Sequence, residues 1–151
     1  MRFVLRLQTM IAALLLALAY ASGAPAADAE ANRKVVLDFY EKGLNQKDAD
    51  AAIALMGDRY VQHNPNAADG PEGFRKFIGF LKEKFPNSKS EIKRALVDGD
   101  YVILHVHAVR EPGTRGNAII DIFKLENGKI VEHWDVVQPI PENPANNNGM
   151  F

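Results

Sequence analysis

The sequence predicts an α+β domain with helices in the first half of the chain and strands in the second half. Before Pro86, apolar residues recur at helical spacing. After Pro86, runs rich in β-branched residues are separated by turn dipeptides such as Asp98-Gly99 and Asn127-Gly128. The chain has 151 residues, of which 47% are hydrophobic and 25% are charged, and these values suit a single folded unit.

Three helices are expected, each with a start signal and an apolar stripe. They are expected from Asn32 to about Leu44, from Asp48 or Asp50 to Met56, and from Asp69-Gly70-Pro71 to Phe85, where Pro86 ends the last one. Between the second and third helices, Tyr60-Val61 is a brief extended piece that breaks at Asn64-Pro65.

Four strands complete the predicted order ααβαββββ. They are expected near residues 91–97, 101–110, 117–125 and 129–138. The tail from Pro139 to Asn148 is rich in Pro and Asn, so we expect it to be irregular and able to fold across the mouth of a pocket.

Residues 1–26 are expected to be a secretory signal peptide that is not part of the domain. Arg2 and Arg6 precede an apolar stretch from Met10 to Ala19, and Ala24-Pro25-Ala26 is a small-residue cleavage site, with Ala19-Tyr20-Ala21 as a second candidate. The alternative is an uncleaved membrane anchor, although the stretch is short for a membrane span.

The mature domain, residues 27–151, is therefore expected to be periplasmic or secreted and free of the membrane after cleavage. The chain has no cysteine, which excludes a disulfide, a thiol nucleophile and lipoprotein attachment. Without Arg2 and Arg6, 16 basic residues remain against 19 acidic ones, a formal charge of −3. This balance gives no support for nucleic acid as a partner.

The last predicted hairpin contains several titratable groups inside apolar runs. Asp121 lies in its first strand, and Glu132, His133 and Asp135 lie in its second, beside Trp134. Polar groups in the middle of strands are costly unless they are hydrogen-bonded or functional. This hairpin therefore predicts a pocket with a polar lining.

The length of the hairpin loop decides which of these side chains share a face. A two-residue turn at Asn127-Gly128 would set Asp121 opposite Trp134. A three-residue loop with Gly128 in the left-handed region would set Asp121 opposite His133 and place both on one face with Asp135. We favour the three-residue loop, because glycine suits the left-handed position.

These motifs resemble those of a known family. Gly128-Lys-Ile-Val-Glu-His-Trp-Asp135, preceded by Asp121-Ile-Phe-Lys124, resembles the terminal hairpin of SnoaL-like polyketide cyclases, which belong to the nuclear transport factor 2-like superfamily. Tyr60-Val-Gln-His-Asn-Pro65 and the ending Asn148-Gly-Met-Phe151 resemble a subgroup described as predicted aldol-condensation enzymes. The resemblance covers about Ala31 to Phe151.

The resemblance implies a cone-shaped fold in which a curved mixed or antiparallel sheet packs on about three N-terminal helices around a pocket. It also implies a homodimer, paired through the open face of the sheet, and neither a cofactor nor a metal. Members of the superfamily include cyclases, isomerases, epoxide hydrolases, dehydratases and non-catalytic binders. The fold alone therefore does not fix the function.

Three residues are candidates for catalysis. In the cyclases a last-strand Asp is taken as the general acid/base, and Asp135 matches that position. A His on the preceding strand assists there, whereas this sequence has Asp121, a departure that questions a polyketide substrate. His63 precedes the Asn-Pro turn. The turn can direct the His63 side chain into a cavity, where it could act in proton transfer, or the side chain can serve only as a structural contact within the turn.

Further residues are expected to bind substrate. They are Asn64, His105, His107, His133, Trp134, Tyr60 and Phe77. His105 and His107 share one face of a strand, a spacing that can bind a metal, but a polar cavity lining or a solvated face is the alternative and the resemblance implies no metal. Trp134 is interpreted mainly as core packing or pocket wall.

Two functions remain open. The first is a cofactor-free lyase or isomerase that enolises a small hydrophobic carbonyl compound, of the aldol condensation, cyclase or isomerase type. The second is a secreted small-molecule-binding protein with the same pocket and no turnover. Signatures of serine hydrolases, phosphate-binding loops and dinucleotide sites are absent from the sequence.

Overall fold

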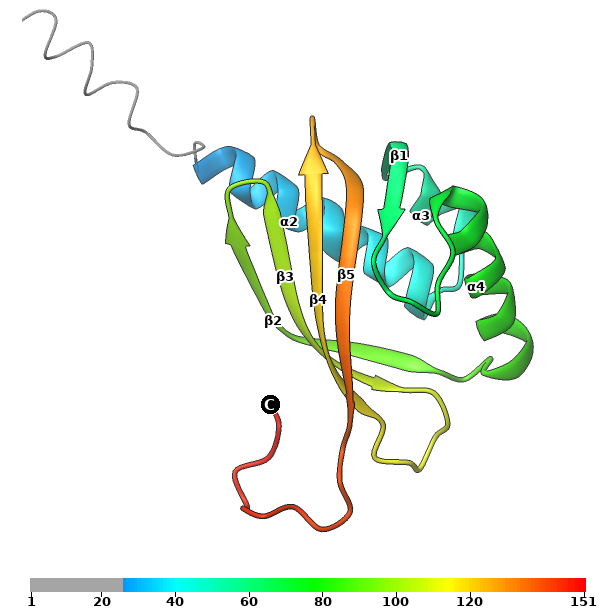
Figure 1. Ribbon diagram of the computed structural model, residues 1–151, viewed down its shortest axis with the longest axis vertical. Helices are drawn as coiled ribbons and strands as arrows, with labels where there is room; N and C mark the ends of the chain where they lie inside the picture. Colours follow the sequence, from blue (N-terminus) through cyan, green and yellow to red (C-terminus); the bar gives the residue numbers. More distant parts are fainter. Residues whose placement is uncertain (1–25) are drawn as a thin grey trace, which may run out of the picture.

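The computed structural model describes residues 26–151, and it confirms the predicted α+β class (Figure 1). The predicted signal peptide lies almost entirely outside the described residues. Within the described range, no helix combines the length and the apolar character needed to cross a membrane.

The elements follow the predicted order. They are helix α2 (Ala26–Tyr40), the π-helical turn η2 (Glu41–Asn45), α3 (Ala49–Ile53), β1 (Met56–Gln62), α4 (Gly70–Lys84), β2 (Lys89–Asp98), β3 (Tyr101–Val109), β4 (Asn117–Glu126) and β5 (Lys129–Pro139). The predicted helix start at Asn32 is wrong, because α2 already runs through the alanine-rich segment before it, and alanine is the best helix former. Asp48, rather than Asp50, caps α3 by accepting a hydrogen bond from the Ala51 amide at 3.0 Å.

The strands form one open, curved sheet in the order β1-β5-β4-β3-β2. Strands β2 to β5 are antiparallel neighbours, and β1 pairs in parallel with β5, so the sheet is mixed. Figure 1 shows α2 crossing one face of the sheet, while α3 and α4 lie beside β1. We call the face toward α2 the inner face and the opposite one the outer face.

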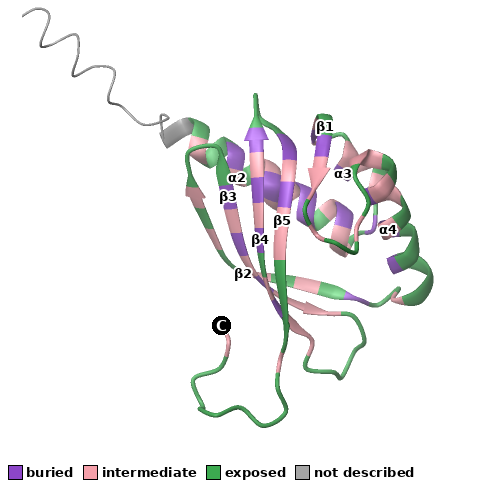
Figure 2. Cartoon of the chain, in the orientation of Figure 1, coloured by how far each residue is buried: buried purple, intermediate pink, exposed green. Residues whose placement is uncertain are grey.

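The core lies between the inner face and the helices. Figure 2 shows that most buried segments of β3, β4 and β5 lie at the end of the sheet that α2 crosses. Strand residues that alternate toward α2 are almost fully buried, among them Leu104, Val106 and Phe123. The Phe39 ring of α2 packs between Phe74 and Phe123, with ring centroids 4.9 and 5.7 Å away. This aromatic cluster holds α2 and α4 against the sheet.

The β4–β5 hairpin corrects one prediction. Glu126 pairs with Lys129, and both Asn127 (φ 51°) and Gly128 (φ 71°) are left-handed, so the loop has two residues rather than three. This is the turn whose twist matches that of the flanking strands, and Asn tolerates the left-handed region. The three-residue loop is therefore wrong.

A β-bulge nevertheless brings the polar residues to one face. Lys124 pairs with Glu132 but the next residue, Leu125, pairs with Ile130, so Val131 is the extra residue. The bulge shifts the register by one, and Asp121 lies opposite Asp135 rather than opposite His133 or Trp134. Asp121, His133 and Asp135 consequently share the inner face.

The C-terminal tail lies over the outer face and not over the inner cavity. The Phe151 ring contacts His105 and His107 of β3, at centroid distances of 5.2 and 4.9 Å. The tail after β5 therefore packs against the back of the sheet, contrary to the expectation that it folds across a pocket mouth.

Candidate functional site

A cavity of about 780 Å³ opens between the inner face of the sheet, α2, α4 and the segment after β1. Its walls are largely apolar and include Phe74, Phe77 and Ile119. One region is polar instead. It is formed by Tyr40, Tyr60, Gln62, Asn64, Asp121, His133 and Asp135. A volume of this size and a few convergent polar groups are typical of small-molecule sites.

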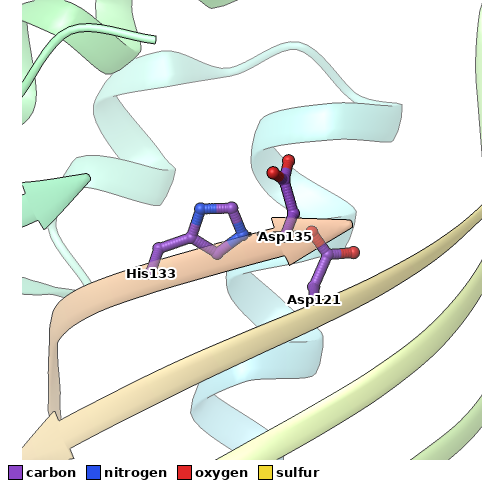
Figure 3. Close-up of side chains that lie close together, drawn as sticks. All are labelled: Asp121, His133 and Asp135. Carbon is purple, nitrogen blue, oxygen red and sulfur yellow. Dashed lines mark hydrogen bonds and ion pairs between the residues drawn. The ribbon is translucent and has the colours of Figure 1, made fainter. Parts of the chain in front are cut away.

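Three titratable side chains meet in the polar region. One carboxylate oxygen each from Asp121 and Asp135 and one ring nitrogen of His133 all lie within 4.8 Å of one another. Figure 3 shows that the three side chains project from the same side of the β4–β5 pair. The bulge at Val131 produces this arrangement. With the two-residue turn alone, Asp121 would pair with Trp134 and would lie on the face opposite to His133 and Asp135.

Asp121 is buried, and each of its carboxyl oxygens has a hydrogen-bond partner. It is 4% exposed, its Oδ1 lies 3.0 Å from His133 Nε2, and its Oδ2 accepts a hydrogen bond from the Tyr40 hydroxyl at 3.1 Å. Burial raises the pKa of Asp121, while His133 and Tyr40 oppose that rise. Burial and the nearby Asp121 also raise the pKa of Tyr40 well above its usual value, so Tyr40 stays a neutral donor.

Asp135 is half-buried and has a different environment. The Nδ2 of Asn64 donates to both of its oxygens, each at 2.8 Å. The oxygen and nitrogen of the Asn64 side-chain amide cannot exchange places without loss of a hydrogen bond, because Oδ1 accepts one from the backbone N–H of Asn66 at 2.8 Å. The turn after β1 thus holds a donor against Asp135 while leaving this carboxyl beside the cavity.

His133 is held between two partners. Its Nδ1 lies 3.0 Å from Gln62 Oε1, and its ring packs on Phe123 with centroids 4.6 Å apart. Gln62 is fixed in turn, because its backbone N–H donates to Asp69 Oδ1 at 2.7 Å. Sequence reasoning missed the role of Gln62, although strand alternation from Tyr60 does place it on the same face.

One known protein family matches the greater part of this chain. A family model described as "SnoaL-like domain" matches residues 36–133, which is more than half of the chain. The protein belongs to the SnoaL-like family. The matched segment begins inside α2 and ends at His133, so it contains α3, α4 and Asp121 but stops two residues before Asp135.

Solved structures show that this SnoaL-like protein has a nuclear transport factor 2-like fold. A nuclear transport factor 2-like protein from Cytophaga hutchinsonii is 20% identical over 72% of this chain and 90% of its own, with a TM-score of 0.60. A protein of Jannaschia sp. CCS1, provisionally classed as a SnoaL-like polyketide cyclase, is 21% identical over 77% and 90%, with a TM-score of 0.61. One from Kribbella flavida, provisionally classed as a ketosteroid isomerase, is 16% identical over 80% and 87%, with a TM-score of 0.60.

At these identities the solved structures show the fold alone. No curated protein matches the SnoaL-like chain. These comparisons confirm the predicted family and fold, while the aldol-condensation subgroup stays a prediction.

His63 does not line the cavity, which corrects its predicted place beside the two acids. Its Nε2 lies 2.9 Å from Glu132 Oε1, and its ring stacks on Trp134 at 4.5 Å with an interplanar angle of 4°. Gln62 pairs with His133 in the parallel ladder, and successive strand residues point to opposite faces. Gln62 and Asn64 therefore point inward, whereas His63 and Trp134 lie on the outer face.

His105 and His107 also lie on the outer face of the SnoaL-like sheet, not in the cavity. His105 Nδ1 is 2.7 Å from Arg94 Nη1, and His107 Nε2 is 2.8 Å from the carbonyl oxygen of Arg115. Their neighbours Leu104 and Val106 fill the core instead, as alternation requires. Of the predicted substrate-binding residues, those that line the cavity are Tyr60, Asn64, Phe77 and His133.

The arrangement suits proton transfer. Two carboxyl groups lie in one cavity, one buried against an imidazole and the other held by an amide. In enzymes, such different environments allow one carboxyl group to act as an acid and the other as a base. Asp121, His133 and Asp135 are also residue types that bind metals, and one possible ligand atom from each lies within 4.8 Å of the others. The direct contact of His133 Nε2 with Asp121 Oδ1 at 3.0 Å forms a pair that can share a proton, which supports acid/base chemistry by the side chains themselves.

Proposed function

We propose that this SnoaL-like protein is an enzyme that removes an acidic proton from the carbon beside a carbonyl group in a small hydrophobic compound. The observation that carries the proposal is the pairing of Asp135 and Asp121 in one apolar-walled cavity with different hydrogen-bond partners. The proposed chemistry needs no cofactor. Aldol condensation with cyclisation and double-bond isomerisation are both reactions of this kind.

In the proposed reaction, Asp135 is the general base. It takes the proton from the α-carbon, and the electron pair of the broken C–H bond forms an enolate. The proton held by Asp121 and His133 is delivered to the enolate oxygen, and the Tyr40 hydroxyl stabilises the Asp121 carboxylate that remains.

Two outcomes can follow from this enol. In an aldol condensation, its carbon attacks a second carbonyl of the same molecule and a carbon–carbon bond forms, while the enol oxygen returns its proton to the Asp121–His133 pair and the new alkoxide takes the proton from Asp135. In an isomerisation, Asp135 returns its proton to a different carbon, and the enol oxygen again returns its proton to the Asp121–His133 pair as the carbonyl reforms. Both outcomes restore the starting protonation of the site.

The cavity supports a small hydrophobic substrate. Its volume is within the range of small-molecule pockets, and the rings of Phe74, Phe77 and Phe80 contribute to one wall. Apolar walls also lower the local dielectric constant, which strengthens the interaction between a proton donor and a developing enolate.

Proton exchange tests the proposed function without knowledge of the natural product. The protein is incubated in D₂O with a panel of hydrophobic ketones and 1,3-dicarbonyl compounds, and NMR follows deuterium entering the α-carbon. Exchange well above that of buffer is the expected result. Tight binding of these compounds in native mass spectrometry without exchange would instead support the non-catalytic binder.

We also propose that the domain is exported. The charged start, apolar stretch and Ala24-Pro25-Ala26 site of the sequence support this proposal. The mature protein is expected to begin within a few residues of Ala27 and to be periplasmic or secreted. N-terminal sequencing of the native protein is the measurement, and retention of Met1 would contradict export.

A homodimer paired through the outer face of the sheet is proposed as well. This face exposes large apolar side chains, including Leu96 at 61% and Val136 at 71% exposure. The molar mass in solution should be twice that of one chain, and Val136→Lys should reduce it. A monomer at all accessible concentrations would contradict this proposal.

A further inference from the structure

The orientation of the Gln62 side chain is fixed by a backbone donor. The amide N–H of Asn64 donates to Gln62 Oε1 at 3.0 Å. A backbone N–H can only donate, so the oxygen and not the nitrogen of the Gln62 amide must face Asn64. The nitrogen then points away and donates to the Tyr60 hydroxyl at 3.4 Å.

This orientation decides which nitrogen of His133 carries hydrogen. The same Gln62 oxygen lies 3.0 Å from His133 Nδ1, and a carbonyl oxygen can only accept. Nδ1 must therefore be protonated. Without its hydrogen, the lone pair of Nδ1 would face the lone pairs of the Gln62 oxygen inside a buried site, which is costly.

The other ring nitrogen then constrains Asp121. A neutral imidazole protonated on Nδ1 presents a lone pair on Nε2, and Nε2 lies 3.0 Å from Asp121 Oδ1. An ionised Asp121 offers only acceptors, so the contact needs one more proton, either on Asp121 or on Nε2. In both cases the Asp121–His133 pair holds that proton and has no net charge.

We infer that Gln62 is a positioning residue that makes the Asp121–His133 pair retain a proton, so that Asp135 is the group left to accept one from a substrate. The catalytic consequence rests on the proposed function, whereas the position of the protons does not. Asn64 contacts both the positioning residue and the base, because its backbone N–H fixes the orientation of Gln62 and its side chain donates a hydrogen bond to Asp135.

The surroundings of the pair are consistent with this assignment. The titratable groups that face it are Tyr40 from α2, Tyr60 from β1 and Asp135 from β5, and the exposed Lys76 and Arg110 also line the cavity. Burial raises the pKa of both tyrosines, so they stay neutral. The negative charge nearest to the pair is thus Asp135, which favours retention of the proton.

The position of the hydrogen can be read by NMR. Long-range ¹H–¹⁵N correlation spectra of the ¹⁵N-labelled protein distinguish protonated from unprotonated imidazole nitrogens. His133 is expected to be protonated on Nδ1 at neutral pH. His107 is an internal reference, because its Nε2 donates to the Arg115 carbonyl and is expected to carry hydrogen there. A His107→Gln variant assigns its signals.

Two substitutions at Gln62 separate positioning from packing. Gln62→Leu removes the acceptor, so a neutral His133 can turn an Nε2–H toward ionised Asp121, and Nδ1 should lose its hydrogen at neutral pH. Gln62→Glu keeps an acceptor and should keep Nδ1 protonated. If proton exchange is found, the pH above which its rate falls should be lower in Gln62→Leu and higher in Gln62→Glu than in the unaltered protein.

Three results would overturn the inference. They are a neutral His133 protonated on Nε2 in the unaltered protein, an Nδ1 hydrogen that persists in Gln62→Leu, and its loss in Gln62→Glu. If Gln62→Leu does not fold, the unaltered protein and Gln62→Glu still decide. Absence of exchange with every carbonyl compound would remove the proposed function but not the tautomer, so the two failures can be told apart.

Discussion

Asp135→Asn is expected to lower the rate of α-proton exchange by at least about 10²-fold, because that is a typical contribution of a general base. The amide has the shape of the carboxyl group but cannot take a proton from carbon. Ligand affinity should change little, since the apolar walls and the Asp121–His133 pair are untouched. The measurement is deuterium incorporation under saturating compound, with binding followed separately by native mass spectrometry.

Glu132→Gln is the matched control for Asp135→Asn. It makes the same chemical change on the same strand, but Glu132 lies on the outer face and contacts His63. The control should exchange protons at the rate of the unaltered protein. If Asp135→Asn also keeps that rate, Asp135 is not the base.

Local patterns were sufficient to predict the elements and the polar hairpin. The alternation around His133 and the β-branched runs are properties of neighbouring residues, and the structure confirms the strands that they indicate. The family resemblance added the curvature of the sheet and the position of the helices, which the structure of this chain confirms.

The register of the hairpin was harder to predict. Ile130 and Val131 are both apolar and both buried, so nothing in the residue types marks Val131 as the extra residue of a bulge. The bulge adds one residue to β5, and this offsets the one-residue difference in register between a two-residue and a three-residue loop as far as the shared face is concerned. The shared face of Asp121 and Asp135 was therefore predicted, but from a loop that the structure does not have.

The hydrogen-bond partners in the cavity could not be predicted from spacing. Tyr40 and Asp121 are 81 residues apart in the chain, and Asn64 and Asp135 are 71 apart. Such pairs follow from how α2 and β1 pack on β4 and β5. For His63 the parallel β1–β5 pairing was decisive, since it turned Gln62 and Asn64 inward and left His63 outside.

Asp121→Asn is expected to reduce proton exchange by about 10²-fold while preserving the fold, because it removes the proton that the enolate oxygen would receive. The substituted amide imitates a protonated Asp121: its NH₂ can donate to His133 Nε2, and its oxygen can accept from the Tyr40 hydroxyl. Asp121→Ala would leave both partners unsatisfied in a buried site and should be clearly less stable. Thermal unfolding and deuterium incorporation separate the two effects.

Asp121→Asn is also expected to change how the free energy of unfolding depends on pH. Burial raises the pKa of Asp121 in the folded state above its unfolded value, so the folded protein binds this proton more tightly. The resulting stability is complete below the unfolded pKa and is lost as the pH rises through the folded pKa. The amide that replaces the carboxyl group does not titrate, so the variant should lose less stability than the unaltered protein over that interval. Parallel loss in both proteins, measured by denaturant unfolding across this pH range, would show that Asp121 is not the proton-holding acid.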